Sequence, residues 1–109
     1  MIELTDSSAE VIAERFGALS EPMRLRLLNA LRRGEMSVGD LAEESGASQA
    51  NASKHLQLLL QQGFIERRKE GTTTWYHIAD PAVFELCSLI SAGIDKVLER
   101  RRKLLRQRG

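Results

Sequence analysis

Hydrogen-bonding side chains crowd a short segment that begins at Ser48. They are Ser48, Gln49, Asn51, Ser53, Lys54 and His55. Amide and hydroxyl groups match the donor and acceptor pattern on the edges of base pairs, whereas Lys and His can hold phosphates. The segment therefore has the chemistry of a surface that reads duplex DNA. For His55 a partly buried ring tied to the backbone is the alternative.

Three consecutive cations form a second group, next to the turn signal Glu70-Gly71. They are Arg67, Arg68 and Lys69. On a projecting loop, such cations can straddle a phosphate backbone or reach a minor groove. We expect Gln49, Asn51, Ser53 and Lys54 to contact bases, and Ser48, His55, Arg67, Arg68 and Lys69 to hold phosphates.

A pair of helices positions the first group. Apolar residues at helical spacing predict a short helix over residues 37–44 and a longer one over residues 49–62, with its leading half polar. Gly46 can adopt the left-handed backbone of a tight turn, and Ser48 can cap the second helix. Residues 37–62 therefore read as a helix-turn-helix.

A β-hairpin positions the second group. From residue 64 to residue 78 the pattern changes to period two, with Thr74, Tyr76 and Ile78 on one face of the second strand. A helix-turn-helix followed by a basic hairpin is a winged helix-turn-helix, with the wing at residues 64–78.

Helices outside this unit complete a single domain. Residues 8–34 predict two scaffold helices, with Ser20 as the cap of the second. A last helix is expected over residues 81–106, with Asp80 as its cap and an apolar stripe longer than one small domain can cover. A second copy of the chain is the natural cover. The fold class is mostly α with a small β-hairpin.

Three segments resemble the ArsR family of repressors over about residues 8–100. They are SEPMRLRLLNAL at residues 20–31, SQANASKHLQLL at residues 48–59 and GFIERRKEGTTTWYHI at residues 63–78. The resemblance implies a symmetric homodimer, built largely from the first and last helices, that represses transcription at a palindromic operator until an effector releases it. The interface residues that we expect are Val11, Ile12, Val83, Leu86, Cys87, Ile90, Ile94 and Val97.

The residues that bind metal in relatives are missing. Metal-sensing relatives carry a Cys-x-Cys pair on the first helix of the helix-turn-helix, or Asp, His and Glu ligands on the last helix. Here residues 35–41 contain no Cys, and Ala82, Gly93 and Lys96 occupy the corresponding region of the last helix. No metal or other cofactor is expected. The effector is left open as an unknown small molecule or a redox agent.

Cys87 is the only cysteine, so an internal disulfide is impossible. One interpretation makes it a small apolar residue in a packed seam. The other places it near its symmetry mate, where oxidation would alter the dimer. Neither interpretation requires the oxidising environment of a secreted protein.

Composition agrees with a DNA-binding protein. The 109 residues carry a net charge of only +1, but cations outnumber acids in residues 48–79 and 100–109. The basic C-terminus either clamps flanking phosphates or is a solvated helix end. No membrane span or export signal is present, so a cytoplasmic location is expected.

Two other function classes compare poorly with a DNA-binding regulator. A winged-helix protein-interaction module without DNA binding would expose an apolar surface where this helix is polar. An enzyme would need paired carboxylates in a pocket, a phosphate loop or a nucleophile with its base, and the sequence contains none of these. We therefore expect no catalytic residues.

Overall fold

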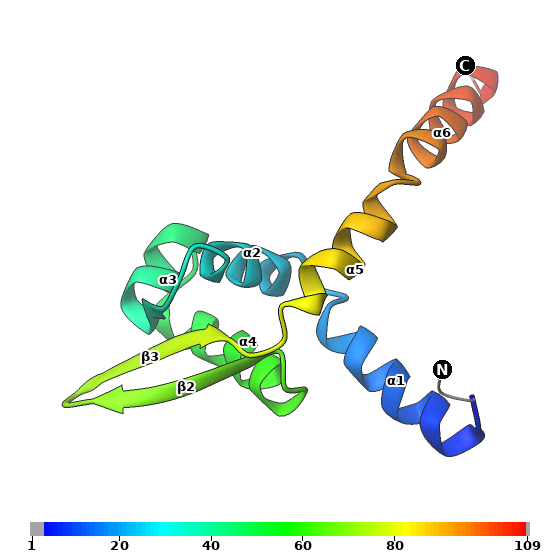
Figure 1. The fold of residues 1–109 in the computed structure, drawn as a ribbon. Helices are drawn as coiled ribbons and strands as arrows, with labels where there is room; N and C mark the ends of the chain where they lie inside the picture. The colour runs from blue at the N-terminus through cyan, green and yellow to red at the C-terminus, as the bar shows by residue number, and fades with distance from the viewer. Residues whose placement is uncertain (1–3, 109) are drawn as a thin grey trace.

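The computed structural model describes residues 4–108 and has the mostly helical winged helix-turn-helix fold that the sequence predicts. Its elements are α1 (Asp6–Ala18), α2 (Pro22–Leu31), β1 (Met36–Ser37), α3 (Val38–Ser45), α4 (Gln49–Gln61), β2 (Ile65–Glu70), β3 (Thr73–Ile78), α5 (Ala82–Ser91) and α6 (Ile94–Arg108). In Figure 1, α2, α3 and α4 gather beside the sheet, whereas α6 projects away from this body on the opposite side from the wing.

The core forms where the predicted apolar faces of α2, α3 and α4 meet the start of β2. The largest fully buried side chains are Leu27, Leu31, Leu41, Leu56, Leu59 and Ile65. Helical spacing places the leucines of each helix on one face, and burying them removes their apolar surface from water. This packing fixes α4 with its opposite face outward.

The turn between α3 and α4 has the predicted conformation. Gly46 has φ 77°, a left-handed conformation that a residue with a Cβ adopts only with strain. Ser48 then begins α4, and its Oγ accepts a hydrogen bond from the amide of Asn51 at 3.1 Å. Both predictions about this turn are confirmed.

The wing is a three-stranded sheet instead of the predicted simple hairpin. The strand order is β1-β3-β2, all antiparallel, and β1 pairs Met36 with Tyr76 and Ser37 with Trp75. A strand of two residues shows no alternation, so its pairing with β3 could not be read from the local pattern. The added strand ties the start of α3 to the base of the wing.

The cap of α2 differs from the prediction. Glu21 is the N-cap residue, and its carboxylate accepts a hydrogen bond from the amide of Met23 at 2.7 Å. Ser20 instead donates its hydroxyl to the carbonyl of Gly17 in the last turn of α1. The N-cap residue of α5 is Pro81, not Asp80 as expected, although the carboxylate of Asp80 accepts a hydrogen bond from the amide of Ala82 at 3.2 Å.

The single last helix that we expected is two helices. α5 ends at Ser91 and α6 begins at Ile94, with Ala92 and Gly93 between them. Ser88 and Ser91 donate their hydroxyls to carbonyls one turn earlier, which bends helices, and glycine is a weak helix former. These two local effects account for the break.

Candidate nucleic-acid interface

The outward face of α4 carries the residues predicted to contact bases. Gln49, Asn51, Ser53 and Lys54 are all exposed, whereas Ala52 on the same turns is completely buried. The polar groups thus lie on a helix whose opposite face is locked into the core. This arrangement gives a rigid row of donors and acceptors that can enter a major groove.

The predicted phosphate ligands on and beside α4, unlike the residues predicted to contact bases, already have partners within the protein. The Oγ of Ser48 already accepts a hydrogen bond from the amide of Asn51, and its hydroxyl proton is what it could donate to a phosphate. The ring of His55 retains 16% exposure, and its Nδ1 lies 3.2 Å from an Nη of Arg24. His55 is therefore a partly buried ring held by a side chain, not by the backbone.

The two faces of the wing differ in what their cations can do. Arg67 pairs with Tyr76 and Lys69 with Thr74 across the strands, so both lie on the face that contains the buried Tyr76. Their side chains are exposed and form no ion pair with any residue between 4 and 108. They are the free cations of the wing.

Arg68 lies on the other face, where two carboxylates hold it. Its guanidinium donates to Glu35 at 2.6 and 2.9 Å and to Glu70 at 2.7 Å, and it lies above the ring of Trp75. The hydrogen bond from Arg68 lowers the pKa of Glu35 below its usual value, so the carboxylate stays ionised and paired at neutral pH. The expectation that Arg68 holds a phosphate stays a prediction, and it requires the guanidinium to leave these carboxylates.

The sequence did not single out Glu35, because this residue lies 33 positions before Arg68 in the chain. No local pattern connects them. The contact exists because β1 places Glu35 at the edge of the sheet. His77 lies on the neighbouring central strand β3, where its Nε2 lies 3.1 Å from Glu66 and its Nδ1 lies 3.7 Å from Glu35.

Replacement of single cations should separate the two faces of the wing. We expect Arg67→Ala to lower the slope of log affinity against log salt concentration by about one, because one phosphate contact is lost. Arg68→Ala should change the slope by less than half of that, since Glu35 and Glu70 already neutralise its charge. Fluorescence anisotropy with a DNA duplex at several salt concentrations measures both slopes. Equal slopes would show that Arg68 leaves its carboxylates for DNA.

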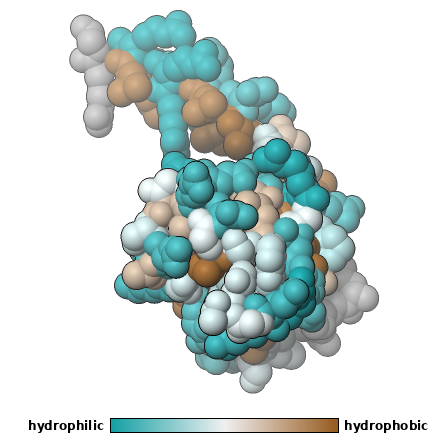
Figure 2. All heavy atoms as spheres, turned by 90° about the vertical axis from the view of Figure 1, so that its left-hand side faces the viewer, coloured by the Kyte–Doolittle hydropathy of each residue, from teal (hydrophilic) through white to brown (hydrophobic). Residues whose placement is uncertain are grey.

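The predicted interface residues lie mostly on exposed surface. Val11, Ile90, Ile94 and Val97 are exposed, and Ile12, Leu86 and Cys87 are partly exposed. Val83 is the exception, because its side chain is 2% exposed within the core of its own chain. In Figure 2 apolar side chains gather on the projecting C-terminal segment, while the body below is mostly hydrophilic.

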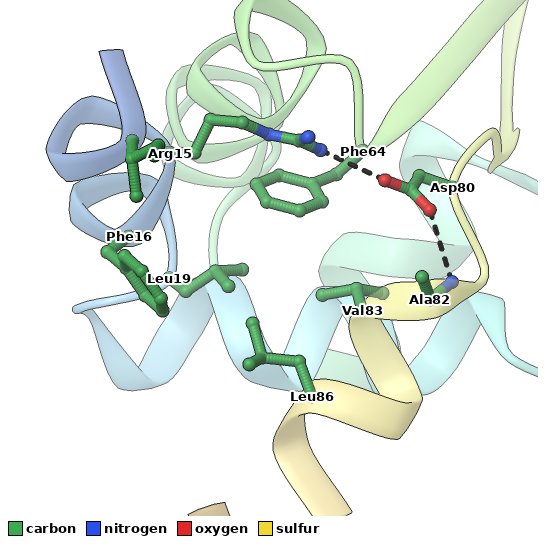
Figure 3. A pocket seen from close by; sticks show the side chains of 9 residues that line it. Arg15, Phe16, Leu19, Phe64, Asp80, Ala82, Val83 and Leu86 are labelled. Atoms are coloured by element: carbon green, nitrogen blue, oxygen red, sulfur yellow. Dashed lines mark hydrogen bonds and ion pairs between the residues drawn. The ribbon is translucent and has the colours of Figure 1, made fainter. Parts of the chain in front are cut away.

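A cavity of about 280 Å³ opens between α1 and α5. Its walls are apolar and include Phe16, Phe64 and Leu86 (Figure 3). Beside it, the guanidinium of Arg15 lies over the ring of Phe64 and pairs with Asp80 at 3.0 Å. Because Asp80 also accepts the amide of Ala82, one carboxylate joins α1 to α5.

Among residues 4–108, no group of three His, Cys, Asp or Glu side chains is arranged to hold a metal ion. Within the same range, no helix combines the length and apolar character needed to cross a membrane.

Comparison with known proteins agrees with this geometry. The model of the family described as "Bacterial regulatory protein, arsR family" matches residues 21–67. A Streptomyces lividans protein named "Probable mercury resistance operon repressor" is 34% identical over 87 residues, which cover 80% of this chain and 70% of that protein.

Two solved structures have the same fold. NolR from Sinorhizobium fredii superposes with a TM-score of 0.74 at 32% identity, covering 84% of this chain and 95% of NolR. A homodimeric winged helix-turn-helix DNA-binding domain from Mycobacterium bovis has a TM-score of 0.72 at 34% identity, covering 92% and 95% of the two chains. The chain thus belongs to the arsR family of bacterial regulatory proteins, and it is a DNA-binding transcriptional regulator.

Proposed function

We propose that the protein is a homodimeric repressor that binds a palindromic operator. The observation that carries this proposal is the polar, exposed leading half of α4 above a completely buried apolar face. Gln49, Asn51, Ser53 and Lys54 contact base edges. Ser48, His55, Arg67 and Lys69 hold phosphates, with the two wing cations reaching the backbone beside the groove.

Dimerisation follows from the apolar surface that one chain leaves uncovered. The proposed interface consists of Val11, Ile12, Leu86, Cys87, Ile90, Ile94 and Val97. Most of these residues lie on α1 and α5, on the two sides of the 280 Å³ cavity, which a side chain of the partner would fill. The homodimeric domain from Mycobacterium bovis supports the same assembly. A two-fold axis then presents two copies of α4 to the two halves of a palindrome.

We propose that the effector is not a metal ion bound at the sites that metal-sensing relatives use. The mercury resistance repressor of Streptomyces lividans is a relative, but this chain has one cysteine, and Cys87 lies on α5. The effector that we propose is therefore a small molecule or a redox agent that acts near α5. Cys87 is partly exposed, so a thiol reagent can reach it in a single chain.

The competing candidate, a protein-interaction module without DNA binding, lacks support from the surface of α4. Its leading half exposes amides, a hydroxyl and an ammonium group instead of an apolar patch. The family consists of regulatory proteins, and we assign no enzymatic activity. We place the protein in the cytoplasm because that is where a bacterial regulator meets its operator.

Substitution of Gln49 tests the proposal. Gln49→Ala should weaken binding by about 1–2 kcal/mol at one base position of the operator, because a bidentate contact is lost there. Gln61→Ala is the matched control, since it removes the same exposed side chain from the far end of the same helix. Anisotropy titrations with the promoter duplex and its single-base variants measure the difference. Equal effects of the two substitutions at every base position would contradict this assignment.

A further inference from the structure

Arg24 is the one charged residue that the core encloses among residues 4–108, with 9% exposure. It lies in the first turn of α2, and its guanidinium points back to the end of α1. Its Nε donates to the carbonyl of Ala18 at 2.7 Å, and an Nη donates to the carbonyl of Gly17 at 3.1 Å. The last carbonyls of a helix lack partners within the helix and carry partial negative charge, so a cation suits them.

The third contact of Arg24 reaches α4. Its other Nη lies 3.2 Å from Nδ1 of His55, 31 residues further along the chain. An arginine in a protein stays protonated and only donates, so Nδ1 must be the acceptor. A neutral imidazole with an accepting Nδ1 carries its proton on Nε2. Arg24 therefore selects one of the two neutral tautomers of His55.

The remaining nitrogen of His55 is well placed for DNA. Within residues 4–108, Nε2 makes no hydrogen bond, and the ring keeps part of its surface exposed. His55 follows Asn51 by four residues, so both lie on the same side of α4. The Nε2–H group thus has no partner among the described residues and is available to donate to a phosphate on this side of α4.

We infer that Arg24 is a positioning residue for DNA binding, which holds the His55 ring with Nε2–H directed at a phosphate of the operator. This inference rests on the proposed function and adds how one of its phosphate ligands is oriented. Arg24 contacts no DNA itself. It acts through His55, and because it also holds the end of α1, it connects a helix of the proposed dimer interface to the recognition helix.

Glu21 is the other charged group beside this contact. Its carboxylate lies 3.9 Å from Nδ1 of His55 and accepts the amide of Met23. It is therefore occupied as the cap of α2, and Arg24 is the closer partner of the ring. An exchange of partners from Arg24 to Glu21 would require the proton on Nδ1 and would reverse the tautomer.

Nitrogen NMR of the full chain measures the tautomer without DNA. The protein has two histidines, and a His77→Gln sample assigns the two sets of ring signals. We expect His55 to show the Nε2–H tautomer in the wild type. In Arg24→Lys, which keeps the charge but loses the planar fork, we expect a mixture of tautomers. Nδ1–H in the wild type, or an unchanged tautomer in the variant, would overturn the inference.

DNA affinity tests the role of Nε2–H. In His55→Gln the amide nitrogen can occupy the place of Nε2, whereas in His55→Asn it reaches only to the place of Nδ1. Anisotropy with the promoter duplex should therefore show that the affinity of His55→Gln is within about threefold of the wild type. The affinity of His55→Asn should be roughly tenfold weaker, because one hydrogen bond to a charged group is lost. Equal losses in the two variants would overturn the phosphate contact.

The two sets of measurements keep the two proposals apart. Absence of specific DNA binding by the wild type would end the proposed function and the phosphate contact together, while the NMR result would still decide whether Arg24 sets the tautomer. Specific binding by the wild type with an Nδ1–H ring would preserve the proposed function and remove Arg24 from it. Far-UV circular dichroism confirms that each variant is folded.

Discussion

Replacing Ile90 by aspartate is expected to convert the dimer into monomers and to lower operator affinity by at least about a hundredfold, the typical gain from linking two binding modules. Ile90 is 60% exposed in the single chain and lies on the apolar side of α5. A carboxylate at this position would have to be buried without a partner in the dimer, which is strongly unfavourable. Each monomer could then engage only one half of the operator.

Sedimentation equilibrium gives the mass of the variant, and anisotropy gives its affinity. Ser88→Asp is the matched control, because Ser88 is exposed on the opposite side of the same helix. This control should remain dimeric and bind as the wild type does. An Ile90→Asp protein that stayed dimeric would place the interface elsewhere on the molecule.

Leu56→Ala is expected to lower the free energy of unfolding by about 2–5 kcal/mol, the range for removing a buried leucine. The side chain of Leu56 is 0% exposed and belongs to the core beneath the polar face of α4. Its removal leaves a cavity where the recognition helix rests on α2 and α3. Because small domains are stable by only about 5–15 kcal/mol, this is a large share of the total.

Urea unfolding at one fixed protein concentration measures the loss, since the stability of a dimer depends on concentration. Leu58→Ala provides the comparison, because it makes the same substitution two residues later on the same helix, where the side chain is 39% exposed. We expect that variant to lose less than about 1 kcal/mol, as is usual for surface positions. Similar losses at the two positions would mean that α4 is rotated from the orientation described above.

The helix-turn-helix was predictable because its determinants are local. The spacing of Leu56 and Leu59, the glycine at position 46 and the serine at position 48 each specify backbone geometry within a few residues. The leucine spacing, the glycine and the serine all favour the same local structure, a helix followed by a turn and a second helix. Local agreement of this kind is what makes an element readable from sequence.

The parts that were missed depend on contacts between distant residues. The pairing of β1 with β3 and the ion pair of Arg68 with Glu35 each join residues more than 30 positions apart. The same is true of Arg24 and His55. Such contacts follow from the assembled fold, so no pattern within one helix or strand can indicate them.

Two predictions, the cap of α2 and the length of the last helix, were wrong for local reasons. Either Ser20 or Glu21 can cap α2, and the carboxylate prevails because the hydroxyl of Ser20 is used by the carbonyl of Gly17. At the end of the chain, the apolar stripe of the last helix continues past Gly93 although the helix does not. Hydrophobic spacing alone therefore overestimated the length of that helix.

The break between α5 and α6 separates a helix that reaches the core through Val83 from one that extends beyond it. Residues 94–107 are all exposed in the single chain, so a substitution there opens no cavity and disturbs no strand register. A substitution at most positions of α6 therefore costs the single chain little stability, whereas Ile94 and Val97 are constrained by the proposed interface. The charge and reach of this C-terminal arm can thus change while the packing that supports α4 remains intact.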